Sequence, residues 1–427
     1  MAVATMITSF LIMILFTAPV SFAIGLAATI GLVFADGIPL LVVPQRIFSG
    51  ADSFILLAIP LFMLAGALME TGGISARLVE LARVLIGHMR GGLGMAVVVA
   101  EMFFSGISGS TIADVSAIGS LMAPSLVRMG FTPPRAVAII SAASAMGILI
   151  PPCLIMVVIA QIAGVSVGAL FLAGFIPAAV LALAVMGLIY LQARKDGIGG
   201  EKRATWLQLR RAVVRAIIPM MMPVIIFGAI LGGVADPTEA AVLAVVYAFI
   251  VGVFVYKEIK WSQIPKILVD SAVTSGIVIY MVGAASSFSW ILASEQVPAT
   301  IGHVLTSFGD SPLLFFVTSI FVFIVLGAIL EGLPAIIICL PIFLPTALKL
   351  GINPLHYSTV IVAAIGLGLF LPPIGVGLYI ASACANIRAD QSFRAMMPYV
   401  GVLAIGIVIL ILFPTLTLIV PQAVFGR

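Results

Sequence analysis

The fold is decided by two stretches of the sequence, Gly147-Ile148-Leu149-Ile150-Pro151-Pro152 and Gly368-Leu369-Phe370-Leu371-Pro372-Pro373. Each proline pair interrupts a long apolar run in which a helix would otherwise continue. Proline has no N–H and its ring clashes with the carbonyl four residues back, so carbonyls before each pair lose their helical partners. Such breaks persist in a bilayer only where protein, water or an ion satisfies them. Breaks in corresponding positions of two halves predict a transport site.

The segment 106–160 recurs, without a gap, as the segment 327–381. The two copies share seven glycines and prolines at an offset of 221 residues, namely Gly106/Gly327, Pro124/Pro345, Gly130/Gly351, Pro133/Pro354, Gly147/Gly368, Pro151/Pro372 and Pro152/Pro373. Each of these residues fixes a backbone event such as a cap, a break or a tight turn. The alternative is two helix pairs that are kinked alike by chance. We interpret the pattern as one structural unit that occurs twice.

The composition indicates an all-α polytopic membrane protein and excludes a soluble enzyme. Of 427 residues, 63% are hydrophobic and 8% are charged, and the mean hydropathy is +1.33. Residues 1–35 form an apolar run with only Pro19 to bend it, which predicts a retained first span and not a cleaved signal peptide. The three cysteines have no metal-type spacing, so we expect them to be packing residues.

The placement of charges divides the chain into five parts. They are N-terminal scaffold spans (1–70), a first repeat (71–193), a basic cytoplasmic loop (194–215), further scaffold spans (216–294) and a second repeat (295–427). In each repeat we expect an arm helix at the interface, a re-entrant hairpin, a broken helix and a last span. The first arm, 74–89, is amphipathic, as expected for a helix on the membrane surface.

The two hairpins, 91–127 and 312–348, are predicted to enter the membrane from opposite sides. Arg90 and Arg128 flank the first hairpin, which places both of its ends in the cytoplasm. In this arrangement 17 of the 20 Lys and Arg residues face the cytoplasm. The sequence therefore predicts an inverted repeat, with one hairpin on the cytoplasmic side and one on the periplasmic side.

The hairpin tips and helix breaks would place oxygen atoms and helix ends halfway across the membrane. Hydroxyl and carbonyl oxygens suit a small hard cation such as Na⁺, and positive helix ends suit an anionic substrate group. The candidates in the first half are Ser105, Ser108, Gly147, Ile150 and Pro152. Those in the second half, through main-chain oxygen, are Gly327, Gly332, Gly368, Leu371 and Ile374. The alternative is that these small residues only let helices approach closely.

Acidic residues near the tips are functional hypotheses, because an ionisable group at membrane depth is costly. Glu101 and Asp114 flank the first tip. Asp114 either takes part in transport or stabilises the start of the second hairpin arm. The candidates for the substrate region are Ser110, Thr111, Asp114 and Glu331. Because the apolar spans contain no Lys or Arg, a substrate carboxylate would be held by helix ends, hydroxyls or a partner.

Three features in register carry a resemblance to a known family. They are Ala58-Ile59-Pro60-Leu61-Phe62-Met63-Leu64-Ala65-Gly66, the tip Ser108-Gly109-Ser110, and the two Pro-Pro breaks with Gly375 after the second. Over essentially its whole length the chain resembles the large membrane subunit of tripartite ATP-independent periplasmic (TRAP) transporters. The resemblance implies an elevator-type transporter of the bacterial inner membrane, in which a domain carrying two hairpins moves against a scaffold. It also implies Na⁺ coupling, organic acid import, a small four-span membrane subunit and a periplasmic substrate-binding protein.

The resemblance also assigns residues to two Na⁺ sites. The first maps onto Ser105, Ser108, Gly147, Ile150 and Pro152, and the second onto Gly327, Gly368, Leu371 and Ile374. The family often has threonine where this chain has Leu371, so only the main-chain oxygen of Leu371 is expected to serve.

Two other functional classes compete with this interpretation. One is an elevator-type carboxylate/Na⁺ symporter that takes its substrate from solution without a binding protein. The other is a membrane-embedded enzyme, which is disfavoured because the chain lacks paired aspartates on facing spans, a Ser–His pair and an HExxH motif. The chain also lacks the GxxxxGK[ST] loop that would bind ATP.

Overall fold

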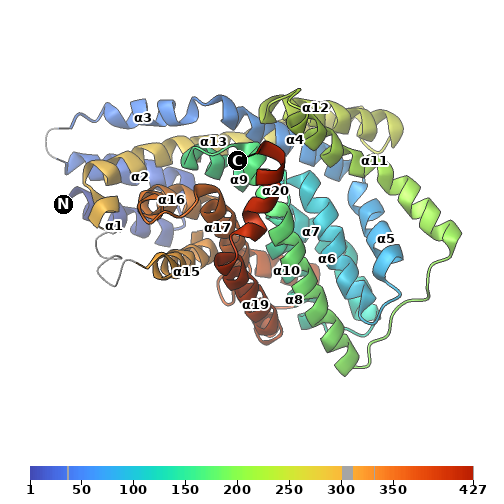
Figure 1. The fold of residues 1–427 in the computed structure, drawn as a ribbon. Coiled ribbons are helices and arrows are strands. Elements are labelled where there is room, and N and C mark those ends of the chain that lie inside the picture. The colour runs from blue at the N-terminus through green and yellow to red at the C-terminus, as the bar shows by residue number, and fades with distance from the viewer. Residues whose placement is uncertain (36–37, 301–310, 331, 427) are drawn as a thin grey trace.

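The computed structural model describes residues 1–35, 38–300, 311–330 and 332–426, and over these residues all regular structure is helical (Figure 1). Eight helical segments of the described residues are long and apolar enough to cross a membrane. They are Phe54–Thr71, Val167–Lys195, Trp206–Leu231, Pro237–Val255, Trp261–Ser294, Pro312–Leu330, Gly332–Lys349 and Ala389–Leu412. The predicted class, an all-α polytopic membrane protein, is confirmed.

The N-terminal region differs from the single span that we expected. It forms two helices, α1 (Ala2–Leu15) and α2 (Val20–Val33), that pack side by side (Figure 1). A Cβ atom at Gly31 would lie 2.7 Å from the Cβ of Met6, so the start of α1 lies beside the end of α2 and the pair is antiparallel. The chain reverses because Thr17 adopts a positive φ of 60° and Pro19 cannot continue a helix.

Long helices of the scaffold segments pack around α4 (Ala58–Thr71) and α13 (Ile264–Ser294). α13 packs along α2 and α3 (Val42–Ala51), whereas α4 packs against α12 (Pro237–Phe249) and α13. α11 (Trp206–Leu231) packs against α12. Asp236 caps the start of α12 in a capping box, because its carboxylate accepts the N–H groups of Thr238 and Glu239 while the Glu239 carboxylate accepts the N–H of Asp236.

The first repeat contains six helices. They are α5 (Ile74–Ile86), α6 (Gly92–Ser108), α7 (Thr111–Arg128), α8 (Pro133–Gly147), α9 (Leu154–Ala163) and α10 (Val167–Lys195). α6 and α7 form a helical hairpin, and α6 also packs against α8. Residue numbers rise together along the α6–α8 contact, from Gly94 beside Ile139 to Ser105 beside Gly147, so these two helices run parallel.

The described part of the second repeat contains a corresponding series. Its helices are α15 (Pro312–Leu330), α16 (Gly332–Lys349), α17 (Pro354–Leu369), α18 (Val376–Cys384), α19 (Ala389–Leu412) and α20 (Thr415–Phe425). α15 and α16 pack against each other and α15 packs along α17, which parallels the contacts of α6 with α7 and α8.

The helix α10 extends between the open ends of the two hairpins, that is, the ends opposite their tips. It has 29 residues and is therefore about 43 Å long. Near its C-terminal end Ala193 packs against Gly91, where α6 begins. At its N-terminal end Ser166 shares a cavity with Asn353, where α17 begins. The open ends of the two hairpins thus lie at opposite ends of α10.

The amphipathic segment predicted at 74–89 contains α5, which buries Ile74, Leu78, Leu81 and Ala82 on one face. Ion pairs fix this helix at both ends. Near its N-terminus Arg77 pairs with Glu258 (2.6 Å), and near its C-terminus Arg83 pairs with Glu201 (2.7 Å). These pairs, made by exposed or partly exposed groups, join α5 to the chain after α12 and to the basic loop 194–215.

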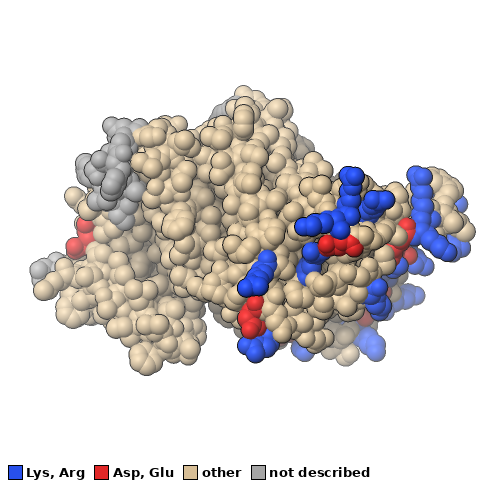
Figure 2. Space-filling view, turned by 90° about the horizontal axis from the view of Figure 1, so that it is seen from below, with Lys and Arg blue, Asp and Glu red and all other residues tan. Residues whose placement is uncertain are grey.

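Basic residues gather on one side of the face that is seen from below in Figure 2. The basic loop lies where α5 and α10 end and α6 begins, because Gly199 accepts the N–H of Gly91 and Glu201 pairs with Arg83. Arg135, in the first turn of α8, forms an ion pair with Asp196. The starts of α6 and α8 therefore lie at the same basic end of the molecule.

Candidate functional site

The tip of the first hairpin brings together the last turn of α6 and the first turn of α7. α6 ends at Ser108, Gly109 has a left-handed φ of 67°, and Ser110 is extended at the start of α7. Glycine adopts this positive φ without steric cost, so the chain reverses within two residues. The reversal brings the side chains of Ser105 and Asp114 into contact.

Asp114 accepts a serine hydroxyl on each of its carboxylate oxygens. Ser105 Oγ donates to Asp114 Oδ2 at 2.6 Å, and Ser108 Oγ donates to Asp114 Oδ1. The N–H of Ser110 donates to Ser108 Oγ at 3.2 Å. Asp114 is 2% exposed and lies in the first turn of α7, where the positive helix end favours a carboxylate. Asp114 therefore lies where a carboxylate favours the start of a helix, and it also joins the two candidate serines.

The helix break between α8 and α9 packs directly against this tip. A Cβ atom at Gly147 would overlap Ser105 Oγ and would lie 3.9 Å from Glu101 Oε2. A Cβ atom at Gly106 would lie 3.1 Å from the carbonyl oxygen of Pro151. One at Gly109 would lie 3.2 Å from that of Pro152. A side chain would overlap Ser105 at Gly147 and would be closely confined at Gly106 and Gly109. The structure thus places all five first-half candidates in one buried cluster.

The turns at the breaks use some of the carbonyls that we expected to be free. The two Pro–Pro bonds are cis, and neither Ile150 nor Leu371 lies in a helix. The carbonyl of Gly147 accepts the N–H of Ile150 at 2.8 Å, and that of Gly368 accepts the N–H of Leu371 at 3.0 Å. Each carbonyl oxygen keeps a second lone pair that a cation could use.

Glu101 forms a second, adjoining part of the first-half cluster. It is fully buried, and Ser144 Oγ donates to its Oε1 atom. Its Oε2 atom has no hydrogen-bond partner among the described residues. The sequence interpretation missed Ser144. The signal was its position three residues before Gly147, on the same face of α8.

The two buried carboxylates of this cluster, Glu101 and Asp114, have no basic partner among the described residues. Buried carboxylates are costly unless they are paired with a cation or protonated. The atoms that could coordinate a cation are carboxylate, hydroxyl and main-chain oxygens, which are the ligands that hard cations prefer. The first-half residues therefore fit a small cation such as Na⁺.

Of the second-half candidates, Gly327, Gly368, Leu371 and Ile374 are linked through backbone contacts. A Cβ atom at Gly368 would lie 3.2 Å from the carbonyl carbon of Gly327, so these two glycines are in close contact. The carbonyl of Leu371 accepts the N–H groups of Ile374 (3.2 Å) and Gly375 (2.8 Å). Gly332 instead packs against side chains of α9 and α17. The candidate Glu331 lies outside the described residues.

The two halves differ in side-chain chemistry and in exposure. Ser105, Ser108 and Asp114 correspond, at the repeat offset, to Leu326, Ile329 and Ala335. The first break is buried throughout, whereas the second is partly open, and Ile374 is 50% exposed. The side-chain oxygens and the carboxylate that these three positions carry at the first tip are therefore replaced by apolar side chains at the corresponding positions of the second half.

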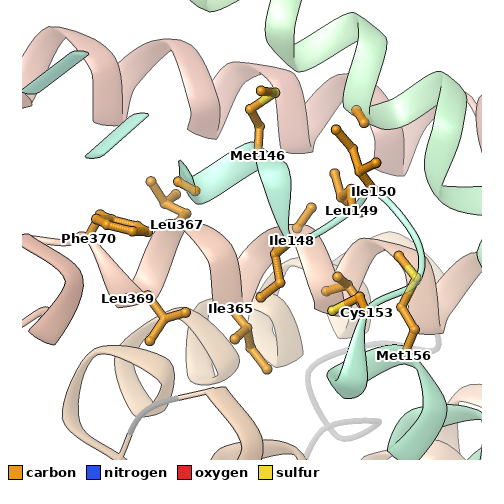
Figure 3. Close-up of a cluster of buried hydrophobic side chains, with 14 of the residues drawn as sticks. Met146, Ile148, Leu149, Ile150, Cys153, Met156, Ile365, Leu367, Leu369 and Phe370 are labelled. Carbon is orange, nitrogen blue, oxygen red and sulfur yellow. The ribbon is translucent and has the colours of Figure 1, made fainter. Parts of the chain in front are cut away.

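The two breaks lie close together in the core. Figure 3 shows the side chains that follow α8 beside those at the end of α17. A Cβ atom at Gly366 would lie 2.8 Å from Ile148 Cγ2. Ile148, Ile365 and Leu369 are all buried in this apolar cluster. The polar cluster at the first tip is thus bounded by a packed apolar core.

Helices of the scaffold segments approach the same region from outside. A Cβ atom at Gly66 of α4 would lie 2.6 Å from the carbonyl oxygen of Ser108. Gly66 belongs to a motif that we identified in the sequence, but sequence reasoning did not predict this contact. A cavity of about 660 Å³ lies between Gly106, Ile150 and apolar side chains of α10 and α11, including Phe227. Its apolar lining does not match an anionic substrate.

The predicted substrate-region residues separate into two groups. Ser110 and Thr111 are partly exposed at the hairpin tip. Asp114 is buried and both of its oxygens face the candidate cation ligands. Ser110 and Thr111, at the N-terminal end of α7, are therefore the candidates that could reach a substrate anion.

Comparisons with known proteins agree with this architecture. Residues 7–416 match the family model described as the tripartite ATP-independent periplasmic transporter, DctM component. The chain is 36% identical over 377 residues to the C4-dicarboxylate TRAP transporter large permease protein DctM of Pseudomonas aeruginosa, covering 88% of each chain. It is 37% identical over 386 residues to the isethionate TRAP transporter permease protein DctMQ of Oleidesulfovibrio alaskensis, covering 90% of this chain and 61% of that protein.

A solved structure provides a comparison at the level of the fold alone. The YdaH transporter of Alcanivorax borkumensis matches with a TM-score of 0.64 over 86% of each chain, at 14% sequence identity.

Proposed function

Because the chain belongs to the DctM component family of the tripartite ATP-independent periplasmic transporters, we propose that it is a permease that imports an organic acid by coupling its uptake to Na⁺. Family membership confirms the resemblance seen in the sequence and makes the chain a multi-pass protein of the bacterial inner membrane. Two relatives are named for a C4-dicarboxylate and for isethionate, both small organic anions. The proposed substrate is accordingly an organic acid, such as a C4-dicarboxylate, a sialic acid or a sugar acid.

The observation that carries Na⁺ coupling is the buried acidic cluster at the first hairpin tip. Two carboxylates lie there without a basic partner in the described part of the chain, beside hydroxyl and carbonyl oxygens. The residues that would hold Na⁺ in the first half are Ser105, Ser108, Gly147, Ile150 and Pro152. In the second half, main-chain oxygens at the contact of Gly327 with Gly368, and in the Leu371–Ile374 turn, would supply a second site.

An inverted-repeat elevator is the proposed mechanism. Its support is that the open ends of the two hairpins lie at opposite ends of the 29-residue helix α10, while the two breaks lie close together. The hairpins, broken helices, α10 and α19 would move as a transport domain. The other long helices, α4 and α11 to α13 among them, would form the scaffold, with the α4 contact at Gly66 as part of the sliding interface.

The chain would work with two other proteins. The family description names a tripartite periplasmic transporter, so we expect a small four-span membrane subunit and a periplasmic substrate-binding protein. The binding protein would deliver the anion to the tip region, because the apolar spans carry no basic side chain that could capture it.

Uptake by the reconstituted system tests this proposal. The permease and its membrane subunit would be placed in proteoliposomes with an inward Na⁺ gradient, and a panel of labelled organic acids would be offered with or without the binding protein. We expect uptake of one acid class that requires both the gradient and the binding protein. Uptake that needs no binding protein would instead support the direct symporter. Uptake that is unchanged when choline replaces Na⁺ would contradict the coupling.

A further inference from the structure

Glu101 presents an unpartnered carboxylate oxygen to the first-half cluster. The side chain is fully buried, one oxygen accepts the hydroxyl of Ser144, and Oε2 has no hydrogen-bond partner among the described residues. A Cβ atom at Gly147 would overlap Ser105 Oγ and would lie 3.9 Å from Glu101 Oε2. Glu101 Oε2 and the candidate ligand Ser105 Oγ therefore both lie beside Gly147.

The two parallel helices explain this placement. Glu101 lies four residues before Ser105, and so on the same face of α6. Ser144 lies three residues before Gly147 on α8. The Glu101–Ser144 hydrogen bond is thus one helical turn from the contact between Ser105 and Gly147. Because Ser144 holds one carboxylate oxygen, the other is directed toward the break.

We propose that Glu101 is an additional ligand of the cation in the first half, with Oε2 as the coordinating atom. This inference rests on the proposed Na⁺ coupling and deepens it. A buried carboxylate oxygen that lacks a donor is costly, and a bound cation would remove that cost. Asp114 has no such unpartnered oxygen, because each of its carboxylate oxygens already accepts a serine hydroxyl.

The proposal makes the two cation sites chemically different. Glu101 and Asp114 correspond in the second half to Val322 and Ala335. The first site would therefore bind its cation with two carboxylates nearby, whereas the candidates of the second site within the described residues offer neutral oxygens. Loss of the Glu101 charge should weaken cation binding without any change of shape in the second half.

The test measures Na⁺ binding directly by thermal stabilisation of the full-length permease in lipid nanodiscs. NaCl replaces choline chloride at constant ionic strength, and the Na⁺ concentration that gives half of the stabilisation is determined. For Glu101→Gln, which keeps the size but removes the charge, we expect this concentration to rise on the order of tenfold. Glu295→Gln, at an exposed position at the end of α13, is the matched control and should leave it unchanged.

The outcomes separate this inference from the proposed function. A Glu101→Gln midpoint within about twofold of the wild type would overturn the Glu101 assignment while leaving Na⁺ coupling intact. If the wild type itself shows no Na⁺-dependent stabilisation, both are overturned. Should Glu101→Gln fail to fold, Ser144→Ala replaces it, because this change releases the carboxylate from its anchor. A raised midpoint supports the assignment and an unchanged one overturns it.

Discussion

Gly147 shows how a single missing side chain shapes the candidate site. The residue ends α8, its α-carbon lies against the hydroxyl of Ser105, and its carbonyl accepts the N–H of Ile150. A side chain at this position would separate the helix break from the hairpin tip. The close approach lets oxygens from α6, α7 and the break converge, and such convergence is what cation coordination needs.

We predict that Gly147→Ala strongly impairs Na⁺-dependent uptake. The new methyl group would overlap Ser105 Oγ, and overpacking of this kind costs about 1–3 kcal/mol. Uptake against Na⁺ concentration in proteoliposomes should show a raised half-saturating concentration or no activity. Gly187→Ala on α10 is the control, because a Cβ atom there meets nothing within 4 Å. An unchanged Na⁺ curve for Gly147→Ala would show that the close contact has no role.

Ser108→Ala should weaken Na⁺ activation of uptake more than it weakens assembly. The change removes a candidate ligand and a hydroxyl bonded to a buried carboxylate, an interaction worth about 1.5–3 kcal/mol. We expect the half-saturating Na⁺ concentration to rise roughly tenfold, with similar protein yield after purification. The matched control is Ser120→Ala, whose exposed hydroxyl bonds only within α7. Equal Na⁺ dependence in the two variants would exclude the proposed role of Ser108.

At the scale of elements, two of the contacts between the scaffold and the first repeat differ in kind. α4 meets the hairpin tip at Gly66, with no room for a side chain. α5 is held by Arg77, whose guanidinium donates to the Gly73 carbonyl (2.7 Å), pairs with Glu258 (2.6 Å) and lies 3.8 Å from the centre of the Tyr256 ring. The contact at Gly66 is a close approach of two backbones, whereas Arg77 forms a fixed joint, a set of polar and ring contacts that hold α5 in place. We therefore expect substitutions at the two contacts to have different effects.

Gly66→Ala should slow uptake without changing Na⁺ affinity. Its methyl group would lie about 2.6 Å from the carbonyl oxygen of Ser108, so α4 and the tip must separate. We expect a several-fold lower maximal rate and an unchanged half-saturating Na⁺ concentration in the proteoliposome assay. Gly276→Ala on α13, where a Cβ atom meets nothing within 4 Å, should behave like the wild type. A changed Na⁺ affinity with an unaltered rate would count against a sliding interface at this point.

Arg77→Lys should lower the thermal stability of the protein although it keeps the charge. Lysine cannot bond the carbonyl and Glu258 in a planar fork while it stacks on Tyr256. Arg77 and Glu258 are 21% and 40% exposed, so the expected loss is about 0.5–1 kcal/mol. Arg388→Lys, in a largely exposed pair with Asp390, should cause no measurable change in the unfolding temperature. Equal unfolding temperatures for both variants would contradict the view of α5 as a fixed joint.

At the scale of the whole molecule, α10 extends from the opening of one hairpin to the opening of the other. One opening lies near the basic loop and the other near the start of α17, about 43 Å apart along the helix. That distance exceeds the thickness of the hydrocarbon core of a bilayer, about 30 Å. The basic loop and Arg135 lie at the first opening, which the positive-inside rule assigns to the cytoplasm.

Cysteine accessibility would test this orientation. In a variant whose Cys153, Cys339 and Cys384 are changed to alanine and whose uptake is retained, Ser311→Cys and Lys202→Cys would be made separately. An impermeant thiol reagent should label Ser311→Cys in intact cells, and Lys202→Cys only after permeabilisation, because the two positions lie near opposite openings. Labelling of both positions from the outside would contradict the inverted arrangement.

The sequence by itself determined the class of the protein and the positions where its helices break. A chain this apolar must satisfy its backbone internally, so it forms helices, and the two proline pairs that follow long apolar runs, Pro151-Pro152 and Pro372-Pro373, end those helices. The same reasoning predicted one span for residues 1–35, where the structure has two antiparallel helices, because Pro19 cannot reveal how far the chain turns.

Only the tertiary structure decided which side chains meet. Ser144 bonds Glu101 from 43 positions away, and Gly66 touches the tip at Ser108, because these contacts depend on how α6 packs against α8 and α4. Packing of parallel helices is fixed by the shapes of their surfaces and not by the local pattern of residues along either chain segment. The sequence therefore supplied the groups of the candidate cation site, and the packing of three helices against a break assembled them.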